Sequence, residues 1–221
     1  MSKKFPRIPH LPWSPGGTRD DRRLDESLIL KMFIGVGNHI IITEKLDGSN
    51  LCLTSNDVFS RSHSGSPIHS SFDLAKKMHA EVAHNIPDRI DVFGEWCFAI
   101  HSIEYDRLPG PYPFYIFGIR DKYGWFCWDE VISFSSELGL NIVPVLFNGI
   151  VEDNFRELTE NLACRESKYG EEREGIVIWP YNGLASDEDF SQQTAKWVKE
   201  NHPKDPDEHW LYKPVRKQGI K

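Results

Sequence analysis

The sequence predicts one compact domain that mixes strands and helices, of the α/β or α+β class. Short runs of β-branched and aromatic residues alternate along the chain with segments of helical periodicity. A length of 221 residues is enough for one such domain with a substantial core, and too short for two of full size. A hydrophobic content of 39%, with thirteen Phe and seven Trp, excludes a disordered chain.

Composition also indicates the compartment. No apolar run approaches the roughly 20 residues that a membrane-spanning helix needs. Residues 1–6 (MSKKFP) lack the apolar segment of a secretory signal. The cysteines at positions 52, 97, 127 and 164 are too far apart for a CxxC metal pair. We therefore expect a soluble, cytoplasmic protein with reduced thiols and no membrane partner.

The formal net charge of −7 argues against a broad basic surface of the kind that binds nucleic acid nonspecifically. The charge is unevenly distributed, however, because residues 1–23 sum to +4 and residues 194–221 to +3, which leaves −14 between them. A polyanion is expected to meet these ends, unless they are merely solvated tails. We divide the chain into a core of about residues 24–200, a basic irregular segment 1–23 and a tail 201–221.

The predicted strands are short and bounded by turn residues. Two apolar runs flank Asp47-Gly48, the strongest local signal for a hairpin turn, so residues 40–53 are expected to form a β-hairpin. The sequence predicts further strands at residues 58–63, 91–97, 114–121, 124–128, 141–147, 174–179 and 195–199.

Helices are predicted between these strands. Residues 71–84 are amphipathic, with Ser70 or Ser71 as the N-cap. Asp129 is expected to cap a helix that ends at Gly139.

Two further segments have helical character. Residues 151–167 are predicted to be a helix with Phe155, Leu158 and Leu162 inward. Residues 24–33 are apolar enough for a short helix or a strand.

Lys45 lies where a predicted strand meets the Asp47-Gly48 turn. Partial desolvation among apolar neighbours would lower the pKa of its amine and favour the neutral, nucleophilic form. On local pattern alone, the alternative is a surface lysine beside an ordinary hairpin.

Arg61 and Glu95 are candidates for contacts with a polar ligand. Arg61 lies 16 residues after Lys45, a separation at which a neighbouring strand can present a guanidinium to phosphate or ribose. Glu95 stands in an apolar strand, where a carboxylate needs a partner such as a sugar hydroxyl or a metal-bound water. A surface arginine, and a core salt bridge or an outward-facing glutamate, are the alternatives.

Three later segments add further candidates. Phe117, next to Gly118, is placed to show an open ring face to a base, although aromatic strand residues are usually core. Glu174 introduces a strand of buried type, and Lys196 and Lys199 stand in the last strand pattern.

In this order, the features resemble the covalent nucleotidyltransferase superfamily of RNA ligases, DNA ligases and mRNA capping enzymes. Residues 45–50 (KLDGSN) resemble its first motif, which carries the nucleophilic lysine. The later motifs of the superfamily are matched, in order along the chain, by Arg61 and by residues 93–95, 114–119, 174–178 and 196–199. The continuation from Glu95 through residues 101–105 (HSIEY) is most similar to the ATP-dependent RNA ligase branch.

The resemblance implies an α+β nucleotidyltransferase domain, ATP-grasp-like, with antiparallel sheets flanked by helices. No OB-fold is expected, because residues 200–221 leave no room for one after Lys199. The resemblance further implies that Lys45 attacks ATP to give lysyl-AMP, that AMP passes to an RNA 5′-phosphate, and that a 3′-hydroxyl then seals the strand. ATP and Mg2+, or Mn2+, are the implied cofactors, and RNA ends are the implied partners.

The resemblance also implies roles for individual residues. Glu174 and Asp47 would hold the metal, and Glu95 would hold either the metal or the ribose. Phe117 would stack on adenine, and Glu44 would recognise the edge of the base. The remaining nucleotide contacts are expected from Asn50, Arg61, Lys196 and Lys199.

The sequence departs from the family pattern at two places. Lys196 and Lys199 are three apart and would face opposite sides of a regular strand, so Lys196 is the better supported contact. Gly118 stands where the aromatic motif commonly has Asp.

Three alternatives remain: a capping-type guanylyltransferase, a DNA ligase, or a non-catalytic nucleotide- or RNA-binding module of the same fold. The protein is expected to be a monomer. The sequence does not specify the natural RNA, or whether a partner protein supplies an end-healing kinase or phosphatase.

Overall fold

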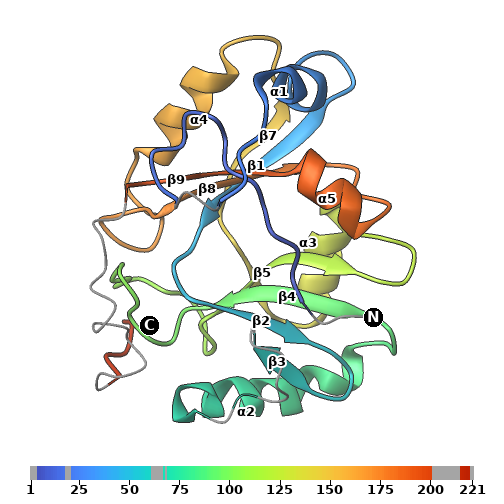
Figure 1. The fold of residues 1–221 in the computed structure, drawn as a ribbon. Coiled ribbons are helices and arrows are strands. Elements are labelled where there is room, and N and C mark those ends of the chain that lie inside the picture. The colour runs from blue at the N-terminus through green and yellow to red at the C-terminus, as the bar shows by residue number, and fades with distance from the viewer. Residues whose placement is uncertain (1–3, 18–20, 61–66, 68, 201–214, 220–221) are drawn as a thin grey trace.

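The computed structural model describes residues 4–17, 21–60, 67, 69–200 and 215–219, and it contains two β-sheets whose inner faces pack together (Figure 1). The first sheet is antiparallel, with the strand order β7-β1-β8-β9. Its strands are β1 (His39–Lys45), β7 (Val145–Ile150), β8 (Gly175–Pro180) and β9 (Ala195–Val198).

The second sheet has five strands in the order β3-β2-β4-β5-β6, and only its β5–β6 pair is parallel. Its strands are β2 (Ser49–Leu53), β3 (Val58–Ser60), β4 (Asp91–Trp96), β5 (Phe114–Arg120) and β6 (Asn141–Ile142).

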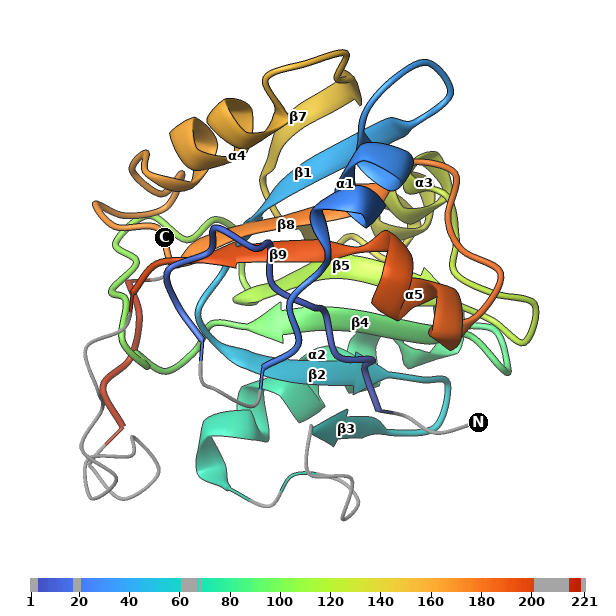
Figure 2. The ribbon, with the colours of Figure 1, turned by 45° about the horizontal axis from the view of Figure 1, so that its top comes forward.

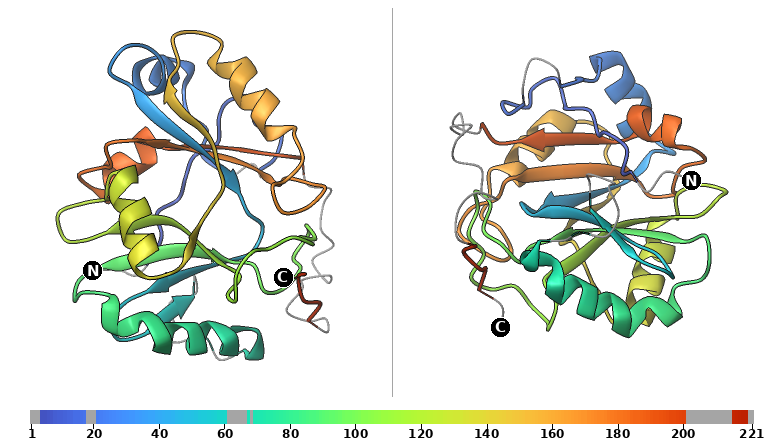
Figure 3. Two further views of the ribbon diagram at one scale, coloured as in Figure 1. Left: turned by 180° about the vertical axis from the view of Figure 1, so that it is seen from behind. Right: turned by 60° about the horizontal axis from the view of Figure 1, so that its bottom comes forward.

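Helices cover the outer sides of both sheets. The first sheet packs against α1 (Glu26–Phe33) and α4 (Phe155–Ala163), and the second against α2 (Asp73–Val82) and α3 (Trp128–Glu137) (Figure 3). The short helices are η1 (Ser70–Phe72), η2 (Ala83–Asn85) and α5 (Asp187–Gln193). This is the predicted α+β arrangement of antiparallel sheets flanked by helices, and the described part of the chain forms no OB-fold.

Strand β1 is buried on both faces, which explains its uninterrupted apolar run. Ile40 and Ile42 belong to the outer core beneath α1 and α4. Ile41 belongs instead to the core between the two sheets. Because side chains alternate along a strand, Thr43 and Lys45 point the same way as Ile41, into the space between the sheets.

The predicted hairpin at residues 40–53 is wrong. β1 pairs with β7 and β8, whereas β2 pairs with β3 and β4, so Asp47-Gly48 carries the chain from one sheet to the other. Gly48 is needed for close approach and not for a positive φ, because a Cβ there would lie 2.6 Å from the Trp96 carbonyl oxygen.

Two helix caps also differ from the predictions. The turn that leads into α2 is capped by His69, whose ring nitrogen accepts from the Ser71 N–H at 3.2 Å, and not by a serine. Helix α3 is capped by Cys127 and not by Asp129, and its Glu130 carboxylate accepts from the Cys127 N–H at 2.8 Å.

The predicted ends of three segments are corrected. Residues 141–147 form two strands in different sheets, β6 and β7, separated by Val143 and Pro144. Residues 124–128 form no strand, although Trp125 makes single bridges to neighbouring segments. The helix predicted at residues 151–167 is shorter, α4, and residues 24–33 contain the helix α1.

The two end segments both pack on the core. The N-terminal segment runs beside β9, where the Leu11 N–H donates to the Lys196 carbonyl at 2.8 Å, and continues toward the second sheet (Figure 2). There the Phe5 ring contacts five other aromatic rings. Residues 215–219 pack against the loop that joins β4 to β5. Across the described residues, no helix has the length and apolar character needed to cross a membrane.

Candidate active site

Lys45 lies at the end of β1 and faces the space between the sheets. In the β1–β8 pairing it is opposite Gly175, so the residue that precedes β8, Glu174, comes alongside it. The Lys45 Nζ donates to Glu174 Oε2 at 2.6 Å, and both side chains are largely buried, 28% and 12% exposed. Strand pairing thus joins two residues that the sequence separates by 129 positions.

Carboxylates control the protonation of Lys45. Burial by itself lowers the pKa of its amine, but Glu174, Glu95 and Asp47 together raise that pKa above its ordinary value. The expectation of a neutral, desolvated amine is therefore wrong for the free protein. Lys45 is an ammonium ion paired with Glu174, and it must lose a proton before it can act as a nucleophile.

Glu95 has the opposite shift. It lies on β4, where burial raises the pKa of its carboxyl group to about 8, although the charge of Lys45 works against that rise. At neutral pH this carboxyl group is therefore mostly protonated. Asn50 stands directly opposite Glu95 in the β2–β4 pairing, so the two side chains lie on one face of the second sheet.

Asp47 is held by the loop between β4 and β5. Its Oδ2 accepts from the Ser102 N–H at 2.7 Å, the Ser102 hydroxyl at 2.6 Å and the Ile103 N–H at 2.9 Å. Burial would raise the pKa of Asp47, but the bonds from Ser102 and the charge of Lys45 bring it below the usual value. Asp47 is thus an anchored carboxylate, and its Oδ2 would have to give up these bonds before it could serve as the predicted metal ligand.

The Glu44 side chain does not lie with Lys45 between the sheets. Glu44 is adjacent to Lys45 on β1 and therefore points to the opposite face, where it is 1% exposed. Its carboxylate accepts from the Ser167 hydroxyl and from the Lys168 N–H at 3.0 Å, and it lies 3.5 Å from the Arg173 guanidinium.

Phe117 lies between the sheets, and its ring is covered. It lies in β5 at a register shift of the β4–β5 pairing and is 8% exposed. The ring of Phe5 meets it edge-on at a centroid distance of 4.9 Å, and Trp179 stacks on it at 6.0 Å. The predicted open face is therefore absent from this arrangement of the described residues.

The three predicted cationic contacts have different outcomes. Lys196 is half-buried on β9 opposite Val177, on the face of the sheet that carries Lys45. Lys199 follows that strand, and its exposed amine lies 3.6 Å from Glu172 Oε2. Arg61 lies outside the described residues.

Comparison with known proteins identifies this arrangement. The sequence profile of the RNA ligase family matches residues 38–198, which include both strands that carry the Lys45–Glu174 pair. The chain belongs to the RNA ligase family. Among curated protein sequences, none matches it.

Solved structures of low sequence identity share the fold of this RNA ligase family member. A mutant RNA ligase of Naegleria gruberi with ATP and Mn is 18% identical, with a TM-score of 0.59 over 87% of this chain and 61% of that one. An archaeal ATP-dependent RNA ligase is 14% identical, with a TM-score of 0.56 over 89% and 48%. The putative ATP-dependent DNA ligase of Aquifex aeolicus is 16% identical, with a TM-score of 0.55 over 89% and 50%. This chain spans about half to three-fifths of their lengths.

Whether the site can hold a metal ion depends on the ligands that the substrate adds to those of the protein. The part of the chain that the structure describes contains no cluster of three or more His, Cys, Asp or Glu side chains that could hold an ion. Mg2+ is commonly held by one or two carboxylates together with substrate phosphates. Glu174 fits that mode, provided that a cation replaces the Lys45 ammonium as its partner.

The sequence motifs did not point to three residues that surround the site. His10 is 2% exposed, and its backbone forms a β-bridge with Lys196. Burial, and then the charge of Lys196, lower the pKa of its ring to about 4, so the ring is neutral. The Tyr105 hydroxyl accepts from the Asp47 N–H at 2.8 Å. Gln218 contacts the Asp47-binding loop. Each residue reaches the site by long-range packing, and the only sequence signal was the HSIEY stretch around Tyr105.

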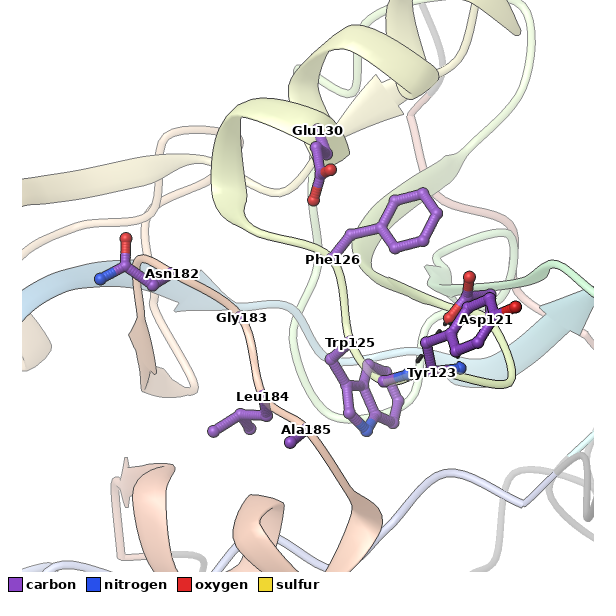
Figure 4. A pocket seen from close by; sticks show the side chains of 10 residues that line it. Asp121, Tyr123, Trp125, Phe126, Glu130, Asn182, Gly183, Leu184 and Ala185 are labelled. Carbon is purple, nitrogen blue, oxygen red and sulfur yellow. Dashed lines mark hydrogen bonds between the residues drawn. The ribbon is translucent and has the colours of Figure 1, made fainter.

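A hollow lies away from this site (Figure 4). Its volume is about 310 Å³, and Trp125, Phe126 and Leu184 are among the residues that line it. One of its lining residues is Asp121, just beyond the end of β5. The Lys45 site lies toward the other end of that strand, where Tyr115 is opposite Glu95. The six residue steps from Tyr115 to Asp121 span roughly 20 Å of strand, so this hollow is not part of the Lys45 site.

Proposed function

We propose that this RNA ligase family member is an ATP-dependent RNA ligase that works through a covalent lysyl-AMP on Lys45. The observation that carries the proposal is the position of Lys45. The amine ends β1 between the two sheets, inside the family motif, and is paired at 2.6 Å with a carboxylate from the strand next to it. A surface lysine beside a hairpin would have neither feature.

In the first step, the Lys45 amine attacks the α-phosphorus of ATP. A P–N bond forms, the bond from the α-phosphorus to the bridging oxygen breaks, and pyrophosphate leaves. Glu174 lies within reach of the proton that the ammonium must lose. Mg2+, when bound, supplies charge neutralisation at the phosphates, and Glu174 is the residue that would hold it.

The second and third steps use RNA ends. An oxygen of the RNA 5′-phosphate attacks the phosphorus of lysyl-AMP, which frees the Lys45 amine and leaves AMP joined to the RNA through a pyrophosphate linkage. A 3′-hydroxyl then attacks the RNA phosphate, a phosphodiester forms, and AMP departs. The protein contributes positioning and charge complementarity to all three steps.

Other residues are assigned to nucleotide binding. Glu95 and Asn50, side by side on the second sheet, contact the ribose, and Lys196 contacts the phosphates. Phe117 stacks on adenine, which requires the Phe5 ring to move. Arg61 is assigned to the phosphates or the ribose, and Lys199 is a phosphate contact only if it leaves Glu172.

Incubation with each radiolabelled NTP and Mg2+, followed by a denaturing gel, tests the proposal. Label from α-labelled ATP should remain on the protein and move to a 5′-phosphorylated RNA when one is added. Retention of GTP label would instead indicate a capping-type guanylyltransferase, and failure to retain any label would indicate a non-catalytic binding module.

A further inference from the structure

The loop between β4 and β5 holds the segment that follows Lys45. Ser102 and Ile103 together donate three hydrogen bonds to Asp47 Oδ2, and the Tyr105 hydroxyl accepts from the Asp47 N–H. Asp47 is two residues from Lys45, and Leu46 between them is 2% exposed. The place of the Lys45 amine therefore depends on the conformation of this loop.

The loop in turn is held by residues 215–219. Gln218 is 5% exposed, and its side-chain amide spans residue 104: Nε2 donates to the Ile103 carbonyl at 2.8 Å, and Oε1 accepts from the Tyr105 N–H at 2.6 Å. The carboxamide thus pairs with the Ile103 carbonyl and the Tyr105 N–H, as a neighbouring strand would, and both of these residues also contact Asp47.

Backbone bonds fix Gln218 in this position. Its own N–H donates to the Phe98 carbonyl at 2.9 Å, and the Ile100 N–H donates to the Arg216 carbonyl at 2.8 Å. On the other limb of the loop, the Gly219 N–H donates to the Tyr105 carbonyl at 2.9 Å. Residues 216–219 therefore tie the start of the loop, at Phe98 and Ile100, to its middle, at Tyr105.

From this chain of contacts we infer that Gln218 is a positioning residue for adenylylation of Lys45: it holds the loop that holds Asp47. The inference rests on the proposed function. Gln218 touches neither Lys45 nor any group that binds nucleotide, so its effect is on the alignment of the amine. A displacement of about 1 Å at a reacting group can cost about 100-fold in rate.

The test is a double-mutant cycle on the rate of lysyl-AMP formation in the full chain. Gln218→Ala should lower the rate constant at saturating ATP by about 10- to 100-fold, with KM for ATP changed by less than about 3-fold. Asp47→Asn should also lower the rate. If Gln218 acts through Asp47, the double variant should be about as slow as Asp47→Asn alone, because residues of one network are not additive.

Two further variants keep the inference falsifiable. Gln218→Glu keeps an acceptor for the Tyr105 N–H and loses the donor to the Ile103 carbonyl, so its rate should fall between those of the wild type and Gln218→Ala. It takes the place of Gln218→Ala if that variant does not fold. Gln192→Ala, at an exposed position of α5, is the matched control and should leave the rate unchanged.

The inference is overturned if a folded Gln218→Ala keeps the wild-type rate, if the losses from Gln218→Ala and Asp47→Asn multiply, or if the loss appears only in KM. If the wild-type protein forms no lysyl-AMP, the proposed function fails, and this inference fails with it.

Discussion

Lys45 and Glu174 form an ion pair of 2.6 Å between adjacent strands, and this pair sets the resting state of the site. The ammonium is stabilised and the carboxylate is neutralised, so neither group is yet in its reactive form. ATP and a divalent cation would separate the pair, since the cation is attracted to Glu174 while the amine turns to the α-phosphorus. On the proposed function, the Lys45 amine becomes a nucleophile only after this pair has separated.

Substitution of Lys45 should abolish the covalent adduct. Lys45→Ala removes the nucleophile, and Lys45→Arg keeps a cation beside Glu174 that cannot be deprotonated at accessible pH. Intact-mass measurement after incubation with ATP and Mg2+ should show one AMP on the wild-type protein and none on either variant. Lys31→Ala, at an exposed position of α1, serves as the control and should be modified normally. An adduct on Lys45→Ala would contradict the assignment of the nucleophile.

Glu174→Gln should separate two effects of the carboxylate. Loss of charge stabilisation should slow adenylylation by about 100-fold at saturating Mg2+. Glu174 is the strongest of the charges that raise the pKa of Lys45, so the pH at which the rate reaches half of its maximum should move downward in the variant. Stopped-time assays across a pH series measure both quantities. Glu171→Gln, three residues earlier and exposed, should change neither, and a wild-type rate in Glu174→Gln would count against the metal assignment.

Glu95 gives a prediction about stability. Its pKa is about 8 in the folded protein and near 4.5 without the fold, because burial favours the neutral form. Between these pH values the unfolded chain therefore binds fewer protons than the folded protein. The contribution of Glu95 to the free energy of unfolding is complete below pH 4.5 and is lost as the pH rises to 8. Glu95→Gln should melt at a higher temperature than the wild type at pH 8, and the difference should shrink toward pH 4.5.

Thermal melts followed by circular dichroism over that pH range check the Glu95 prediction. Glu137→Gln, on the exposed side of α3, should show no such pH-dependent gain. A lower melting temperature for Glu95→Gln at pH 8 would show that the carboxylate is stabilised, and not penalised, by its surroundings. The loss of nucleotide binding expected of the same variant illustrates how a functional group can reduce stability.

Most strands could be predicted from the sequence because their apolar content reflects local burial. Their partners could not, because pairing is decided by residues far along the chain. Asp47-Gly48 is a hairpin signal by composition, yet the apolar runs on its two sides find better partners elsewhere and enter different sheets.

The site was predictable to the extent that a family motif identifies it. The resemblance assigned Lys45 and Glu174 to one site, and the structure places their side chains 2.6 Å apart. It did not indicate that the Glu44 side chain points away from Lys45, as adjacent residues of a strand do. It was silent on Gln218 and His10, whose contacts exist only after both ends of the chain have packed on the core.

The last prediction concerns the RNA, and it follows from where the basic residues lie. Arg216 and Lys217 are exposed, and each has a weak surface partner: the Arg216 guanidinium lies 3.0 Å from Glu104, and the Lys217 amine lies over the Phe98 ring. Lys213 adds a further positive charge to the basic end segment 194–221, and it lies outside the described residues. A few such phosphate contacts should give weak binding that is lost as salt rises.

Replacement of Lys213, Arg216 and Lys217 by Ala should therefore impair sealing more than lysyl-AMP formation, because the proposed ATP site lies between the sheets and the backbone contacts of residues 216–219 are kept. Gel assays on a nicked duplex, with preformed lysyl-AMP to isolate the later steps, measure the two rates separately. The wild-type enzyme should also prefer an RNA 3′ strand over an all-DNA one, since the 2′-hydroxyl and A-form shape distinguish RNA locally. Equal sealing of DNA and RNA nicks would overturn the RNA assignment, whereas unchanged sealing by the triple variant would remove only the tail from the binding surface.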